Sequence, residues 1–136
     1  MSGRTERPST NAVMHVAAFR AALRSFLHES ERAARASGLT PQRHLLLLMI
    51  KGAPDGSEAS TITELSERLK LAQSTVTELV SRAEAAGLIE REQSARDGRV
   101  AHLRLTEEGE RKLAAVFTHL GVERRQLREA FAELES

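Results

Sequence analysis

The chain has 136 residues, which is enough for one domain with a buried core, and its formal net charge of +1 gives no overall attraction to nucleic acid. It contains no cysteine, which excludes disulfides, thiol catalysis and thiolate metal sites. Alanine, leucine, glutamate and arginine are abundant, and four phenylalanines are the only aromatic residues, so helices are favoured over a β-sandwich.

No segment suggests export or membrane insertion. The N-terminal MSGRTERPST is polar and lacks the apolar core of a signal peptide, and the longest apolar run, LLLLMI at 45–50, is far too short to cross a bilayer. We therefore expect a cytoplasmic protein that makes no membrane contact.

Two helices are predicted near the N-terminus. Residues 1–10 mix proline, serine, threonine and charges without periodicity, which predicts a flexible arm. Over 11–36 apolar residues recur at spacings of three and four, which predicts a long amphipathic helix that ends at Gly38. Thr40 and Pro41 form the start of a second helix. Because LLLLMI is apolar on all sides, we expect this helix to be central and covered on every side.

A loop over 52–60 precedes two short helices joined by a tight turn. Thr61 or Thr63 can cap the first helix, and Thr61 and Glu64 have the spacing of a capping box. The second helix is predicted over about 73–86 and ends at the glycine that follows.

A hairpin and a helical segment complete the chain. LIERE and RVAHLRL alternate apolar and polar residues around a turn that contains Asp97 and Gly98, which predicts a β-hairpin. Thr106, followed by two glutamates, opens the last helical segment. Its four-three apolar repeat is interrupted near Gly121, so we expect a kink or two helices there.

The predicted elements have the order helix, helix, short helix, turn, short helix, hairpin and long helix. This is the order of a winged helix-turn-helix between long terminal helices, a mostly α fold with a small β-hairpin wing. In such motifs the second short helix enters the major groove of DNA. That helix and the hairpin are therefore the candidate nucleic-acid interface.

The second short helix has two distinct faces. Its inward stripe consists of Val76, Leu79, Val80 and Ala83. The opposite face is small, polar and able to reach base edges; it carries Gln73, Ser74, Thr75, Thr77, Ser81 and Arg82. Any solvated helix also has a polar face, so this pattern alone does not decide between the two interpretations.

The hairpin favours DNA, because its arginines outnumber its acids. Its charged residues include Arg91, Arg96, Arg99 and Arg104 against Glu92 and Asp97. Arginines on such a protrusion can enter a minor groove or contact phosphates.

Three stretches of the sequence match one known family. Asp97, Arg99, Leu105 and Thr106 reproduce the wing signature Asp-x-Arg, five residues, Leu-Thr, and LTPQRHLLLL and LAQSTVTELVSRAEAAGLIERE also correspond. In these stretches, and from about residue 12 to the end, the sequence resembles the MarR family of bacterial transcription regulators.

The resemblance implies a homodimer whose dimerisation helices are 11–38 and 107–136. Two winged domains, each over 40–106, would read a palindromic operator in double-stranded DNA and repress a nearby promoter. Arg99 would be the minor-groove arginine of the wing, while Asp97 would orient it, form the turn, or do both. The predicted DNA-binding residues are Thr63, Gln73, Ser74, Thr75, Thr77, Ser81, Arg82, Arg91, Arg96, Asp97 and Arg99.

The sequence departs from the family pattern at three positions. Ala72 stands where relatives often have a capping serine or aspartate, so the helix is expected to start at Ser74 or to be ordered by DNA. Glu78 occupies a position that is often basic and would repel phosphate unless it accepts from a cytosine amine. Ala83 is smaller than the usual leucine, so packing there must be closer.

Members of this family often sense small aromatic acids or phenols in a cleft between the dimer helices and the winged domain. Binding there would change the spacing of the two DNA-reading helices. The candidate ligand-binding residues are Arg20, Arg24, His28, Arg43 and His44. The alternative is that these are surface charges on two helices.

Five histidines raise the question of a metal, because some relatives bind zinc. None forms an i, i+4 pair or an HExxH-like cluster, although His28 and Glu29 could serve across a dimer. We expect no metal and no cofactor, and a metal-responsive regulator without an organic ligand stays an alternative.

No enzyme signature is found. GxSxG, a phosphate-binding glycine loop and paired carboxylates of a pocket signature are all lacking, so we expect no catalysis. A winged helix that binds protein instead of DNA is the other alternative, but such a module has no need of an arginine-rich wing.

Overall fold

The computed structural model describes residues 5–93 and 100–134. Its elements are α1 (Thr10–Ala36), α2 (Pro41–Lys51), α3 (Ile62–Leu69), α4 (Gln73–Ala85), β1 (Ile89–Gln93), β2 (Ala101–Leu105), α5 (Glu107–His119) and α6 (Gly121–Glu133). The prediction of a mostly α fold with a small hairpin is confirmed. Within the described ranges, no helix is both long and apolar enough to traverse a membrane.

Side-chain caps set the starts of several helices. Thr40 accepts a hydrogen bond from the Arg43 N–H at 3.1 Å, and Thr106 accepts one from Gly109 at 3.1 Å. Thr61 and Glu64 form the predicted capping box. Each cap satisfies an N–H group that the helix itself leaves without a partner.

The antiparallel hairpin is anchored to the preceding loop. Its register runs from the pair Ile89 and Leu105 to the pair Gln93 and Ala101. Ser60 makes an isolated bridge to Leu103, with backbone hydrogen bonds of 3.1 and 2.8 Å in the two directions. The end of the predicted loop over 52–60 therefore holds the base of the wing in place.

α2 lies at the centre of the winged domain, the name used here for residues 40–106. Leu46, Leu47 and Ile50 are fully buried, but Leu45 is 41% exposed. The expectation that α2 is covered on every side was therefore wrong. Leu45 lines a cleft that α2 shares with α1, and the packing of the described residues leaves this side of α2 open.

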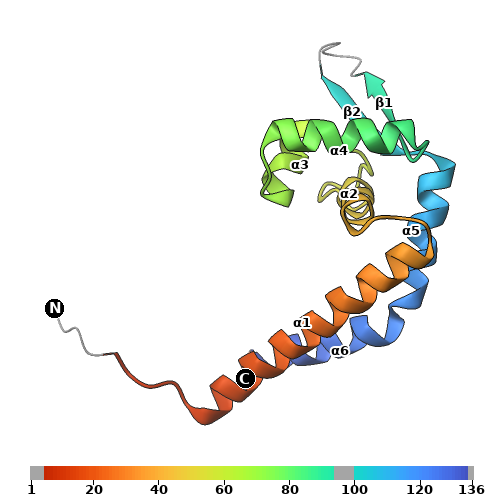
Figure 1. Cartoon of the computed structure of the whole chain (residues 1–136). Helices are drawn as coiled ribbons and strands as arrows, with labels where there is room; N and C mark the ends of the chain where they lie inside the picture. Colours follow the sequence, from red (N-terminus) through yellow and green to blue (C-terminus); the bar gives the residue numbers. More distant parts are fainter. Residues whose placement is uncertain (1–4, 94–99, 135–136) are drawn as a thin grey trace.

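α1 and α6 form a second unit, called the stalk. They lie side by side below the winged domain, which α5 joins to them at one end (Figure 1). The Phe19 and Phe131 rings meet edge to face with centroids 6.0 Å apart. The C-terminal segment divides into α5 and α6 at Leu120 and Gly121, which confirms the expected interruption.

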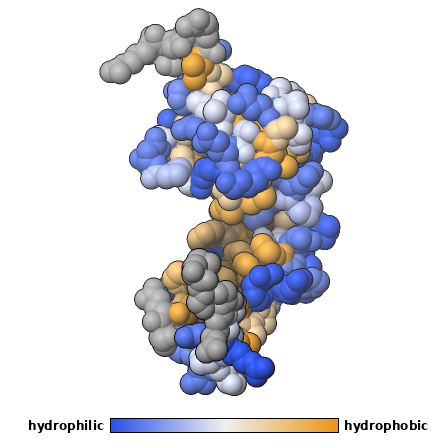
Figure 2. All heavy atoms as spheres, turned by 90° about the vertical axis from the view of Figure 1, so that its left-hand side faces the viewer, coloured by the Kyte–Doolittle hydropathy of each residue, from blue (hydrophilic) through white to orange (hydrophobic). Residues whose placement is uncertain are grey.

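The stalk exposes much of its apolar surface. Among the described residues, the large apolar ones that are at least half exposed are Val13, Met14, Val16, Leu27, Val122 and Phe131 of the stalk and Phe117 of α5. Figure 2 shows hydrophobic surface gathered between the winged domain and the far end of the stalk.

Candidate nucleic-acid interface

The two faces of α4 separate as its sequence predicted. Val76, Val80 and Ala83 are fully buried, and Leu79 is 9% exposed. The six polar residues assigned to DNA are all exposed: Gln73, Ser74, Thr75, Thr77, Ser81 and Arg82. The hairpin extends beyond α4 on the side away from α2 (Figure 1), so both can reach one duplex.

α4 begins at Gln73 without a side-chain cap. Ala72 is extended at φ −63° and ψ 149° and cannot accept a hydrogen bond from the first turn through its side chain. The side-chain amide of Gln73 donates a hydrogen bond to the Thr63 hydroxyl of α3 at 3.3 Å. The structure thus brings together two of the predicted DNA-binding residues, from the two helices of the motif.

Ion pairs connect the charged residues around α4. Arg82 pairs with Glu78, one turn earlier on the same exposed face. Arg91 of β1 donates from Nε to both carboxylate oxygens of Glu84, each at 3.0 Å. Arg91 therefore connects the hairpin to α4.

The excess positive charge of the hairpin depends on the residues between its two strands. Arg104 lies 3.2 Å from Glu92, so the charges of these two residues largely offset each other. Three predicted contacts, Arg96, Asp97 and Arg99, lie outside the described residues.

A charged cluster holds the winged domain against α5. Lys51, at the end of α2, lies 2.8 Å from Glu110 of α5 and 2.9 Å from Glu58 of the loop. Hydrogen bonds with Glu110 and Glu58 raise the pKa of Lys51, and the bond with Lys51 lowers the pKa of Glu58. The cluster thus connects the end of α2 and the loop to α5.

The predicted ligand residues do not converge on one cavity. A cleft of about 220 Å³ separates α1 from α2 and is lined by Phe26, Ser30, His44 and Leu45, among others. Of the five candidates only His44 lines it, and burial lowers the pKa of this histidine. Arg20, Arg24 and His28 are exposed on α1, and Arg43 is half-buried on α2.

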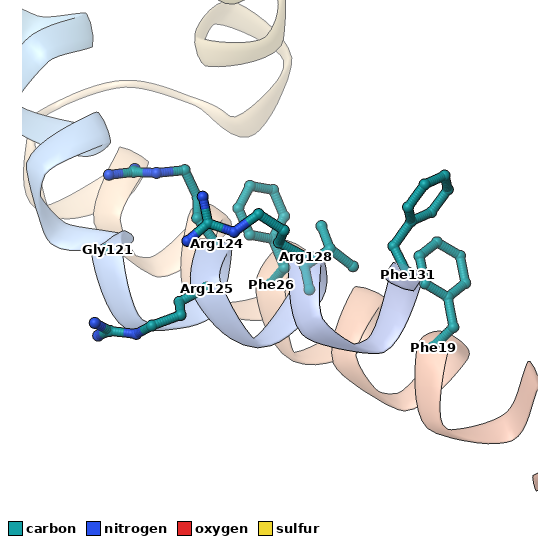
Figure 3. Close-up of a pocket in the computed structure, with 8 residues that line it drawn as sticks. Phe19, Phe26, Gly121, Arg124, Arg125, Arg128 and Phe131 are labelled. Carbon is teal, nitrogen blue, oxygen red and sulfur yellow. The ribbon is translucent and has the colours of Figure 1, made fainter. Parts of the chain in front are cut away.

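A larger cleft, of about 810 Å³, lies between α1 and α6 and was not predicted. Phe19, Phe26, Leu127 and Phe131 form its apolar part, and Arg124, Arg125 and Arg128 surround it (Figure 3). The Arg124 guanidinium also lies 3.8 Å from the centre of the Phe117 ring. The repeated arginines of α6 were the signal, but only the packing of α6 on α1 places them beside the phenylalanines.

Metal ligation finds no support in the described part of the chain. No three histidine, aspartate or glutamate side chains gather there closely enough to hold an ion.

Comparison with known proteins identifies the domain. Residues 37–100 match the family model described as MarR family. Over most of its length, the winged domain of this chain is therefore similar to the MarR family. The match to the Bacillus subtilis HTH-type transcriptional regulator YsmB is 39% identical over 75 residues, which are 55% of this chain and 51% of YsmB. It thus covers about half the length of this curated relative.

Solved structures of two regulators extend the similarity to the stalk. The transcriptional regulator Tm0710 from Thermotoga maritima is 28% identical with a TM-score of 0.64, over 85% of this chain and 76% of Tm0710. A mutant of MarR from E. coli, solved in complex with operator DNA, has a TM-score of 0.63 over 85% of this chain and 78% of its own. At 18% identity this second likeness shows the fold alone.

Proposed function

We propose that the chain is a transcription regulator that binds double-stranded DNA as a homodimer. The observation that supports this most directly is the exposed polar face of α4, on a domain similar to the MarR family. Each α4 lies in a major groove, and each wing contacts the flanking backbone and minor groove. The protein catalyses no reaction in this role and acts in the cytoplasm.

The DNA contacts divide into two kinds. Gln73, Ser74, Thr75, Thr77, Ser81 and Arg82 read base edges or adjacent phosphates, and Thr63 supports them from α3. Arg96 and Arg99 bind the backbone and minor groove, with Asp97 in the turn between them. Arg91 contributes by fixing the angle between hairpin and α4 through Glu84.

The dimer is formed by the stalks. The exposed apolar side chains of α1, α5 and α6 are more than a monomer normally leaves in contact with water, and a second copy covers them. The twofold axis then presents two α4 helices to the half-sites of a palindrome.

The regulator is a repressor that a small aromatic or phenolic ligand releases from DNA. The cleft between α1 and α2 supports this role, because Phe26 and Leu45 offer apolar walls and His44 and Ser30 offer polar atoms. It lies between stalk and winged domain, so a ligand there changes the spacing of the two α4 helices.

The proposal is tested by searching the intergenic DNA beside the gene for an inverted repeat and using this sequence as the operator in a gel shift. Gln73→Ala is expected to cost about 1–3 kcal/mol on this operator and little on random DNA, because Gln73 reads bases. Arg99→Ala should weaken binding to all sequences and lower the salt slope by about one. Arg32→Ala is the control, because it is the same change at an exposed position of α1, outside the proposed interface.

Two results would contradict the proposal. A wild-type protein that does not bind duplexes even at low ionic strength is not a DNA regulator. A protein that is monomeric at all accessible concentrations cannot read a palindrome in the proposed way.

A further inference from the structure

The outward face of α4 carries a carboxylate at its centre. Successive residues of a helix are rotated by about 100°, so Ser74, Glu78 and Ser81 share a sector of about 60° opposite the buried Val76 and Ala83. The Glu78 side chain is 63% exposed, and its two neighbours on this sector are short serines. Glu78 is therefore the longest and the only charged side chain at the centre of this face.

A carboxylate in this place weakens the electrostatic attraction of the helix to DNA. Phosphates repel it, and a carboxylate enclosed by a groove without a donor is strongly destabilised. The face offers no second acid between 73 and 82, so the charge does not belong to a broader acidic surface. In the proposed binding mode the centre of the face points at base edges, where a hydrogen-bond donor would remove the repulsion of the carboxylate.

The major groove limits which base can supply that donor. Guanine O6 and N7 and thymine O4 are acceptors and repel a carboxylate, whereas cytosine N4 and adenine N6 carry N–H donors. In adenine the N7 acceptor lies beside the donor, whereas cytosine has no acceptor beside N4 on this edge. A carboxylate, which only accepts, therefore favours cytosine over the other three bases.

Arg82 keeps the charge compensated before DNA binds. It pairs with Glu78 across one turn, and both side chains are about equally exposed, at 62% and 63%. Such an exposed pair is weak, so its exchange for a contact with a base costs little.

We propose that Glu78 determines specificity by accepting a hydrogen bond from the N4 amine of one cytosine in each half-site of the operator. This inference rests on the proposed function, because it assumes that α4 lies in the major groove.

The test is selection of bound duplexes from a library with randomised sequence, at one fixed salt concentration. The wild type, Glu78→Gln and Glu67→Gln are compared, the last being the same change at an exposed carboxylate of α3. The wild type should enrich cytosine at one position of each half-site. Glu78→Gln should lower this preference by about 5-fold to 150-fold and shift it towards adenine, which glutamine contacts through N6 and N7. Glu67→Gln should retain cytosine.

The outcomes distinguish a failure of this inference from a failure of the proposed function. If the wild type selects a palindrome and Glu78→Gln selects the same bases while binding every duplex more tightly, Glu78 is only a repulsive charge and the inference is overturned. If the wild type selects no sequence at all, the proposed function fails as well.

Discussion

The winged domain and the stalk differ in how completely a single chain buries their apolar side chains. In the winged domain Leu46, Leu65, Val76 and Val80 are all fully buried. In the stalk α6 has no buried residue over its 13 positions, and Phe131 is 54% exposed although it contacts Phe19.

The winged domain and the stalk therefore differ in what stabilises them. The core of the winged domain is complete within one chain, so its stability should not depend on protein concentration. The stalk leaves apolar surface in water, so its stability should depend on a second copy and therefore on concentration.

The largest effect is expected from charges placed in the stalk. Val16→Asp combined with Phe131→Asp puts two carboxylates on the exposed apolar surface and removes side chains whose burial contributes about 1.5–3 kcal/mol each. We expect the dissociation constant of the dimer to rise by at least about 100-fold, measured by analytical ultracentrifugation. Leu71→Asp, at an apolar position 36% exposed outside the stalk, should leave the dimer intact. A dimer of unchanged strength in the double variant would place the interface elsewhere.

A cavity in the winged domain should have the next largest effect. Leu46→Ala removes a fully buried side chain and should lower the free energy of unfolding by about 2–5 kcal/mol, measured by urea denaturation. The loss should be the same at two protein concentrations. Leu45→Ala, one residue earlier and 41% exposed, is the matched control and should cost clearly less. Equal losses for both variants would mean that the side of α2 carrying Leu45 is also covered.

Features that depend on near neighbours were predictable from the sequence. The caps at Thr40, Thr61 and Thr106 involve hydrogen bonds to groups three residues away, so their residue types are sufficient to identify them. The separate faces of α4 follow from helical periodicity alone. The expected start at Ser74 was wrong by one residue, because α4 begins at Gln73 although Ala72 has no capping side chain.

Features that depend on contacts between different elements were not predictable. The bridge of Ser60 to Leu103 crosses 43 positions, and nothing in GAPDGSEAS indicates a strand pairing. Arg91 was assigned to DNA from its charge, but its orientation depends on Glu84, which belongs to another element. The exposure of Leu45 likewise depends on which elements reach α2, and an apolar run does not reveal this.

The smallest expected effect concerns His44, where stalk and winged domain meet. Burial lowers the pKa of His44 from its usual 6.5, so the unfolded chain binds a proton more readily than the folded one. The stabilisation is therefore complete above about pH 6.5 and is lost as the pH falls towards the lowered pKa. His44→Gln does not titrate and should remove this part of the acid sensitivity. The measurement is urea unfolding between about pH 7.5 and 5.5, about one unit on each side of the usual value. His119→Gln, at an exposed position of α5, should retain it. If both variants keep the wild-type pH dependence, the contact between α1 and α2 does not exclude water from His44. The boundary between stalk and winged domain is then more accessible to water than the burial of His44 indicates.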